Sequence, residues 1–285
     1  NGLNLFYKLW NDSENDLNNY KRVDVHWSDV PGRDQKWREE TIRNTSEEQF
    51  RIEFECEFIG STNTLISPSK LRTLVYNRPK SENEHVRIYE KPNPASNYVL
   101  IADTARGVNG DYSAFVVIDI SDLPGRVVAC YQNTQISPMN YPDIIAGFHK
   151  QYNNCYMLVE SNDIGMSVAE SLHNDLELEN VLMSSARGRA GQVLSSGFGT
   201  SGQYFGVRTT KQVKRVGCLN LKTVIESDQL FINDYKILEE LTSFVQKNES
   251  YAAEDGKHDD LVMCLVIFSW VANQRHFKEL TNVDV

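Results

Sequence analysis

From residue 97 onward, apolar and polar positions follow periods typical of regular secondary structure. Apolar runs predict three strands of an antiparallel meander, at 99–105, 114–120 and 127–133. A short, wholly apolar run at 156–160 predicts a strand in the centre of a sheet, and 181–184 predicts another. Helices are predicted over 138–152, 164–175, 209–227, 235–246 and 259–274. Three strands followed by alternating helices and strands predict an α/β fold, with a mixed sheet flanked by helices.

The first 96 residues are less regular. Alternation of Val23, Val25 and Trp27 predicts a half-buried strand over 20–27. The sequence at 46–49 has the capping-box pattern, but the strand-like segment 50–58 that follows argues against a long helix. Residues 67–96 are rich in Pro, Ser, Asn and charged side chains. We therefore predict a small α+β unit over 1–66, a connector over 67–96, and a second domain over 97–285.

Length and composition favour a soluble globular protein. The chain has 285 residues, of which 40% are hydrophobic and 24% charged, enough for one large or two smaller domains. Its longest apolar run, 261–272, is too short to span a bilayer, so no membrane association is expected. The sequence begins at Asn1, as expected of a piece of a longer protein. Five cysteines without a Cys-x-x-Cys pair favour reduced intracellular thiols over disulfides or a zinc site.

The net charge of −10 argues at first against a nucleic-acid partner. The segment 180–225, however, holds seven Lys and Arg residues and no Asp or Glu. A basic segment in an acidic protein is typical of a phosphate-contacting surface, although a solvated helix face and a flexible loop would have the same composition. The candidate DNA-binding residues are Arg187, Arg189, Arg208, Lys211, Lys214 and Arg215.

Three carboxylates, Asp103, Glu160 and Asp260, each adjoin an apolar stretch that should bury them. An ionised carboxylate is too costly to bury alone, and three that converge would repel one another unless cations shared the site. We therefore predict a Mg²⁺ or Mn²⁺ site with two metal ions. Such a site activates a water molecule and stabilises the leaving 3′ oxygen of a phosphodiester.

Each candidate ligand also has a simpler explanation. Asp111 follows Asn-Gly and could be an ordinary turn residue, and Glu160 could be a strand-end side chain turned to solvent. Asp259 or Asp260 could cap the helix that begins there, so the residues alone allow either to be the ligand. His258 is expected outside the metal's direct ligands, supporting the acids or contacting phosphate, because hard cations prefer oxygen.

Two nucleotide-binding patterns are rejected. Residues 197–202 match Gly-x-Gly-x-x-Gly, but they follow Ser-Ser and not a strand, so the dinucleotide interpretation fails. We predict that the loop 186–206 around them is mobile without DNA. No Gly-x-x-x-x-Gly-Lys-Ser/Thr motif occurs, so no ATPase activity is expected from this chain.

Together these motifs resemble a known family. The stretches Ala102–Tyr112, Leu158–Gly165 and Tyr251–Met263, with the basic segment Lys211–Lys222, are similar to the large terminase of tailed phages, specifically the T-even type. The resemblance implies that residues 97–285 form an RNase H-like nuclease that cuts double-stranded DNA during packaging.

The resemblance also implies residue roles. Asp103, Glu160 and Asp260 would be the catalytic acids and metal ligands, and Asp111 an accessory metal ligand. The family pattern favours Asp260 over Asp259. Residues 1–66 would be the tail of the packaging ATPase domain, whose ATP-binding motifs would lie upstream.

The partners implied are double-stranded DNA, the portal protein, a small terminase subunit and the ATPase domain. The implied location is the host cytoplasm, with transient attachment to the procapsid portal vertex. Two alternatives stay open. One is an RNase H-like resolvase or transposase that uses the same carboxylates on junctions or specific ends. The other is a non-catalytic module that grips DNA and docks within the packaging motor.

Overall fold

A mixed β-sheet is the centre of the structure. The computed structural model describes residues 9–10, 12–13, 17–55, 63–106, 111–186, 191–195 and 202–281. Within them the strand order is β1-β2-β5-β4-β3-β6, and β10 pairs with β5. The strands are β1 (Ser81–Glu82), β2 (Val86–Ile88), β3 (Tyr98–Asp103), β4 (Ser113–Asp119), β5 (Gly125–Asn133), β6 (Tyr156–Val159) and β10 (Leu230–Phe231).

The pairing confirms the predicted mixed sheet. Strands β3, β4 and β5 are antiparallel neighbours, as the meander requires. Strand β6 runs parallel to β3, and β10 runs parallel to β5. Strand β2 pairs with β5 in the register Val86↔Tyr131, so part of the predicted connector 67–96 is built into the sheet.

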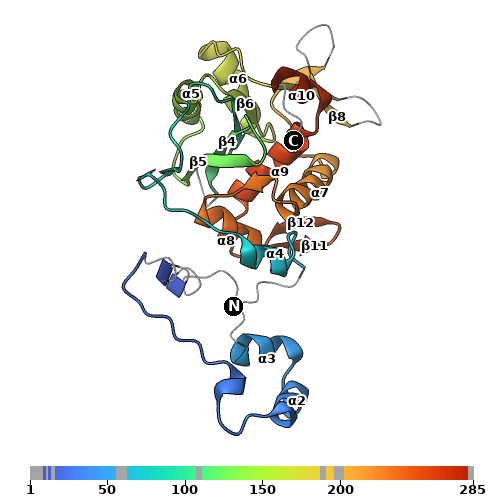
Figure 1. The fold of residues 1–285 in the computed structure, drawn as a ribbon. Helices are drawn as coiled ribbons and strands as arrows, with labels where there is room; N and C mark the ends of the chain where they lie inside the picture. Colours follow the sequence, from blue (N-terminus) through green and yellow to red (C-terminus); the bar gives the residue numbers. More distant parts are fainter. Residues whose placement is uncertain are drawn as a thin grey trace.

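Helices cover both faces of the sheet (Figure 1). On one face lie α5 (Tyr141–Gln151), α6 (Gly165–Glu170) and a π-helical turn (Ser171–Asp175). On the other lie α7 (Lys211–Glu226), α8 (Tyr235–Ser243) and α9 (Asp260–Ala272). Because successive side chains of a strand point to opposite faces, Leu100 packs with α5 and α6 while Ile101 packs with α7, α8 and α9.

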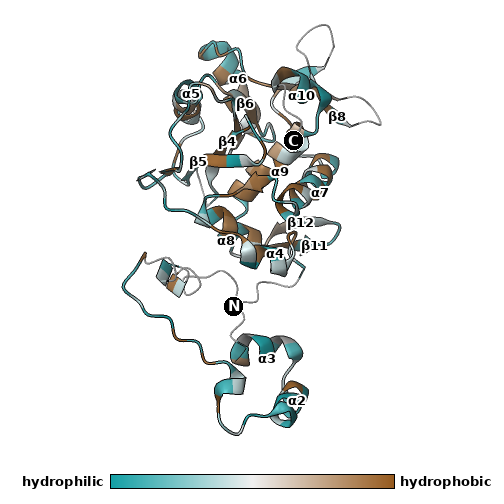
Figure 2. Cartoon of the chain, viewed as in Figure 1, coloured by the Kyte–Doolittle hydropathy of each residue, from teal (hydrophilic) through white to brown (hydrophobic). Residues whose placement is uncertain are grey.

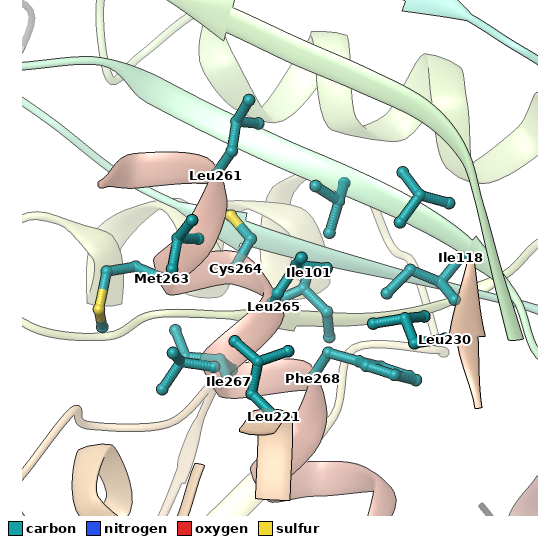
Figure 3. Close-up of a cluster of buried hydrophobic side chains, with 14 of the residues drawn as sticks. Ile101, Ile118, Leu221, Leu230, Leu261, Met263, Cys264, Leu265, Ile267 and Phe268 are labelled. Atoms are coloured by element: carbon teal, nitrogen blue, oxygen red, sulfur yellow. The ribbon is translucent and has the colours of Figure 1, made fainter. Parts of the chain in front are cut away.

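Helix α9 is buried from Leu261 to Ala272 and is apolar on all sides (Figure 2). A helix with this pattern must be enclosed, since no face of it suits water. Its side chains meet Ile101 and Ile118 of the sheet and Leu221 of α7 in one cluster (Figure 3). At Gly217 of α7, an added Cβ would lie 2.4 Å from the Val266 carbonyl oxygen, so the two helices approach closely there.

The N-terminal predictions were partly wrong. Residues 20–27 form no strand, and Val23 and Val25 are 76% and 56% exposed. After a 3-10 turn (Trp27–Asp29) come α2 (Gln35–Asn44) and α3 (Glu47–Phe54), which lie apart from the sheet (Figure 1). The strand predicted from residue 50 is therefore helical as far as Phe54. Phe50 and Phe54 lie one turn apart, and both rings contact Trp37.

Two further differences concern strand pairing. The helix predicted over 235–246 ends at Ser243, and β11 (Phe244–Lys247) pairs with β12 (Ser250–Ala253). The described residues of the predicted mobile loop 186–206 contribute strands β8 (Gln192–Ser195) and β9 (Gln203–Phe205), which flank β7 (Met183–Ala186). Residues 187–190 and 196–201 lie outside the described part.

The remaining helices are α4 (Pro68–Thr73), which lies against α8, and α10 (Arg275–Thr281), which follows α9. In the described ranges, no helix is both long and apolar enough to cross a bilayer. Residues 65–66, at the end of the predicted N-terminal unit, are buried in the same core as α8 and α9.

Candidate active site

Two carboxylates lie at the ends of neighbouring parallel strands. Asp103 is the last residue of β3, and Glu160 directly follows β6. The register Ala102↔Val159 places the two strand ends level with each other. Side chains at the carboxyl ends of parallel strands meet at the same edge of a sheet. The carboxyl groups of Asp103 and Glu160 accordingly lie close enough for Glu160 to raise the pKa of Asp103.

The third carboxylate comes from the first residue of α9. Burial, followed by the charges of Asp259 and Asp111, raises the pKa of Asp260 to about 7. The nearby backbone N–H of Tyr112 acts in the opposite direction and lowers this pKa. The Oδ2 atom of Asp260 is buried and has no hydrogen-bond partner among the described residues. His258 Nδ1 lies 3.6 Å away, beyond hydrogen-bonding distance.

The pKa of Asp103 is affected by several neighbouring acids. Burial raises its pKa well above the ordinary range, and Glu160, Asp260 and Asp259 raise it further. The predicted acids therefore converge, although they lie 57 and 100 residues apart along the chain. Glu160 and Asp260 both disfavour the ionised state of Asp103, which is the electrostatic arrangement that a bound cation would reverse.

The donor atoms fit a divalent cation in type and charge. Carboxylate oxygens are the preferred ligands of hard cations, and the partnerless Oδ2 of Asp260 is a buried acceptor whose satisfaction by a cation would be favourable. Among the described residues, however, no three His, Cys, Asp or Glu side chains close around one point tightly enough to form a metal-binding cluster. The donor atoms of the site thus suit a divalent metal, but the described side chains do not converge tightly on one point.

The other predicted acid-site residues lie beside this centre. Asp111 is exposed, and its charge reaches Asp260. Asp259 does not cap α9 with its side chain. Its Oδ2 accepts a 3.1 Å hydrogen bond from Ala253 N–H of β12. His258 is 44% exposed and packs edge-to-face on Tyr112, with ring centroids 4.9 Å apart.

An exposed ion pair borders the site. Arg106, three residues after Asp103, donates from Nε and Nη2 to Asp163 at 2.5 and 2.8 Å. Asp163 lies three residues after Glu160, so the pair joins the segments that follow β3 and β6. The pair was not predicted from the sequence, because the two residues lie 57 positions apart and nothing in the two stretches that contain them indicates an ion pair.

The predicted basic residues lie near α7. Lys211 and Arg215 line a groove of about 1040 Å³, together with Lys247 and residues 248–250 of the β11–β12 hairpin. Arg208 is exposed and stacks over the Tyr204 ring. Lys214 is partly buried, with Nζ over the Phe244 ring. Arg187 and Arg189 lie outside the described residues.

Two glycines could have drawn attention to the site. An added Cβ at Gly165 would lie 1.8 Å from the Glu160 carbonyl oxygen, and at Gly206, with φ +78°, 2.3 Å from that of Val159. The backbone around Glu160 is therefore packed too closely for side chains. The Oγ atoms of Thr104 and Ser161, next to Asp103 and Glu160, are buried without a hydrogen-bond partner among the described residues.

Comparison with known proteins identifies the fold. The Terminase RNaseH-like domain family matches residues 100–268, which is more than half of the chain. The large terminase nuclease of thermophilic phage G20c, solved with bound magnesium, is 21% identical over 73% of this chain and 97% of that one, with a TM-score of 0.56. Its cobalt-bound structure gives the same values.

The large terminase nuclease domain of Thermus phage P74-26 is also similar. It is 21% identical, the alignment covers 72% of this chain and 93% of that one, and the TM-score is 0.53. At this identity the structures show a shared fold, and the family match reaches across β3, β6 and α9. The chain therefore belongs to the Terminase RNaseH-like domain family, and its sheet and helices have the fold of a phage large-terminase nuclease domain.

Proposed function

We propose that this chain is a divalent-metal-dependent endonuclease that cuts double-stranded concatemeric DNA during viral genome packaging. One observation carries the proposal. Three acids from β3, β6 and α9 meet at one edge of the sheet, and one of them presents a buried oxygen without a partner. Family membership and the fold of phage terminase nucleases support the assignment.

Asp103, Glu160 and Asp260 would hold Mg²⁺ or Mn²⁺. G20c terminase nuclease structures contain bound magnesium, cobalt or zinc, which supports a divalent cation as the cofactor of this chain. When bound, a pair of such ions activates water and stabilises the leaving oxygen in an in-line displacement. Asp111 would serve as an accessory ligand from its exposed position.

The chain's own residues set the conditions for this chemistry. The register of the sheet fixes Asp103 and Glu160 side by side, and Asp260 is fixed by its place as the first residue of α9. Apolar residues of α9 and the strands exclude water from behind the acids, which strengthens their interaction with a cation. His258, whose Nδ1 lies 3.6 Å from Asp260 Oδ2, would lie outside the direct ligands and contact a phosphate or support Asp260.

The groove between α7 and the β11–β12 hairpin is the proposed seat of the DNA backbone. Lys211 and Arg215 are exposed there, and Lys247 of the hairpin lines the opposite side. Basic side chains that flank a groove neutralise phosphates and give binding a strong salt dependence. Arg208 would extend the contact, and Arg187 and Arg189 remain predicted contributors.

The wider assignment is also a proposal. Residues 1–66 would be the end of the packaging ATPase domain. The portal protein, the small terminase subunit and the ATPase domain would be partners, in the host cytoplasm and transiently at the procapsid portal vertex. The T-even type stays a prediction from the sequence motifs.

Plasmid cleavage tests the activity. We expect supercoiled plasmid to be nicked and linearised with magnesium or manganese, to survive with EDTA, and to survive with the Asp260→Asn variant. No cleavage by folded wild-type protein would reject the nuclease and favour a DNA-gripping module. Preference for branched junctions over plain duplex would instead favour a resolvase.

A further inference from the structure

The first turn of α9, which carries Asp260, is capped from another helix. The residue before it, Asp259, makes no side-chain cap, because its carboxylate accepts from Ala253 N–H of β12. In its place Glu240 of α8 accepts a 2.9 Å hydrogen bond from the Val262 N–H. The first N–H groups of a helix need such acceptors when they are buried.

Glu240 has its second oxygen fixed as well. Its side chain is buried, with the residue 6% exposed, and Oε1 accepts a 3.0 Å hydrogen bond from Gln132 Nε2 of β5. The other end of the Gln132 amide accepts from Arg87 Nη2 of β2 at 3.3 Å. The Arg87 donor therefore fixes which way the Gln132 amide points, and the amide in turn fixes Glu240.

The same network anchors α8. Arg87 Nε donates to Asp234 Oδ2 at 2.5 Å, and the Tyr89 hydroxyl donates to the same oxygen at 2.9 Å. The other oxygen of Asp234 accepts from the Ile237 N–H and caps the start of α8. A continuous buried path of hydrogen bonds thus runs from strands β2 and β5 to the first turn of α9.

We infer that Glu240 is a positioning residue for Asp260, acting through the Val262 N–H without touching the reacting atoms. This inference rests on the proposed metal-dependent function. Val262 lies on the same helical turn as Asp260, so fixing its N–H fixes the rotation of that turn. The Asp260 carboxylate is then held toward Asp103 before any metal binds. Groups that orient metal ligands commonly change metal affinity about 10- to 100-fold when removed.

Three variants separate positioning from general stability. Glu240→Ala removes the acceptor of the Val262 N–H. Glu240→Gln can keep that bond but turns an NH₂ group toward the NH₂ of Gln132, which Arg87 prevents from flipping. Adding Gln132→Glu restores a complementary pair with donor and acceptor exchanged, while the new carboxylate still accepts from Arg87. The double variant should therefore behave like wild type.

Binding of Mn²⁺ alone, measured by calorimetric titration without DNA, is the first readout. We expect Glu240→Ala to weaken Mn²⁺ binding about tenfold or more, and Glu240→Gln to weaken it less. Glu240→Gln/Gln132→Glu should recover affinity close to wild type. Hydrogen exchange of residues 259–265 is the second readout, and it should speed up in Glu240→Ala and return to the wild-type rate in the double variant.

Tyr152→Phe is the matched control. It removes a partly buried hydrogen bond, from the Tyr152 hydroxyl to the Glu90 carbonyl, beside the α5-side residues of the core. It should lower the melting temperature without changing Mn²⁺ affinity. Equal weakening of Mn²⁺ binding by the control would show that stability alone is responsible and would overturn the inference.

The outcomes distinguish this inference from the proposed function. Wild-type protein that neither binds Mn²⁺ nor cleaves plasmid would reject the function, and the inference with it. Wild-type protein that does both, while Glu240→Ala binds Mn²⁺ equally well, would overturn the inference alone. If Glu240→Ala does not fold, the Mn²⁺ affinities of wild type, Glu240→Gln and the double variant test the inference. Recovery in the double variant supports positioning, and equal affinity of all three proteins rejects it.

Discussion

The backbone N–H of Glu160 donates a 2.8 Å hydrogen bond to the carbonyl oxygen of Ala102. This bond extends the pairing of β3 and β6 as far as Glu160 itself, beside the end of β3 at Asp103. The spacing of two of the three acids is therefore set by the register of β3 against β6. Asp260 depends instead on the placement of α9.

The identity of the third acid can be tested by comparing two neighbours. We expect Asp260→Asn to reduce plasmid cleavage on the order of a hundredfold or more, because it removes a charged ligand that would hold the metal ions in place to stabilise the transition state. Asp259→Asn should reduce cleavage less, since the Asp259 carboxylate is bonded to the Ala253 N–H. Cleavage rates at saturating Mn²⁺ provide the measurement, with Asp143→Asn on exposed α5 as the isosteric control. The reverse order of effects would assign the ligand role to Asp259.

Stability without metal should fall as pH rises. The pKa of Asp260 is about 7 in the folded protein, above its ordinary value of 3.8. Between these two values the folded state binds more protons than the unfolded state, so each increase in pH favours unfolding. This difference between the folded and unfolded pKa values corresponds to a loss of at most about 4 kcal/mol in the free energy of unfolding, and the loss is complete above pH 7. Asp103, whose pKa is also raised, should act in the same direction.

Denaturant unfolding in EDTA from pH 4 to pH 8 measures this dependence. Asp260→Asn should flatten it and should be more stable than wild type at pH 8. Excess Mn²⁺ should raise the stability of wild type at pH 8 but not that of the variant, because only a folded site binds the ion. A wild-type stability that rises with pH from 4 to 7 in EDTA would contradict the electrostatics of the site.

DNA binding should depend on the groove beside α7. Removing one phosphate contact lowers the slope of log K against log salt by about 0.9 for duplex DNA. We therefore expect Lys211→Ala/Arg215→Ala to weaken duplex binding and to reduce the slope by up to about 1.8. Lys150→Ala, an exposed change on α5 at the opposite face, is the control. Fluorescence anisotropy over a salt series would show an unchanged slope if the groove does not hold DNA.

Replacing a glycine by alanine should have opposite effects at two positions, Gly217 at the close approach of α7 and α9 and Gly147 in α5. Gly217→Ala would place a Cβ 2.4 Å from the Val266 carbonyl oxygen and should destabilise the fold by about 1–3 kcal/mol. Gly147→Ala in α5 meets nothing within 4 Å and should stabilise it by about 0.5–1 kcal/mol. Chemical denaturation of both variants provides the comparison. A neutral Gly217→Ala would mean that α7 can shift away from α9 at little cost.

The sequence predicted the parts of the fold that depend on local pattern. The apolar run ending at Asp103 and the short run before Glu160 are strands because their residues are buried on both sides of the sheet. The helix beginning at Asp260 was expected from an apolar stretch too long for a typical strand. Burial of these stretches is also why their polar ends were recognised as site candidates.

The elements that sequence missed depend on distant partners or on burial. Strand β2 exists because Val86 pairs with Tyr131, 45 residues away, and β11 exists because it turns back on β12. Val23 and Val25 alternate as in a strand, but no described strand pairs with them and both are exposed. The capping role of Glu240 was equally invisible, because it contacts Val262 only after α8 and α9 have packed.

The most direct test of the central claim is the position of bound manganese in a crystal of this protein. Anomalous scattering from Mn²⁺ should give a peak between the carboxylates of Asp103, Glu160 and Asp260, and the peak should be lost in Asp260→Asn. A wild-type crystal with no peak at this edge of the sheet, or with a peak held by other residues, would contradict the assignment of these three acids as the metal site.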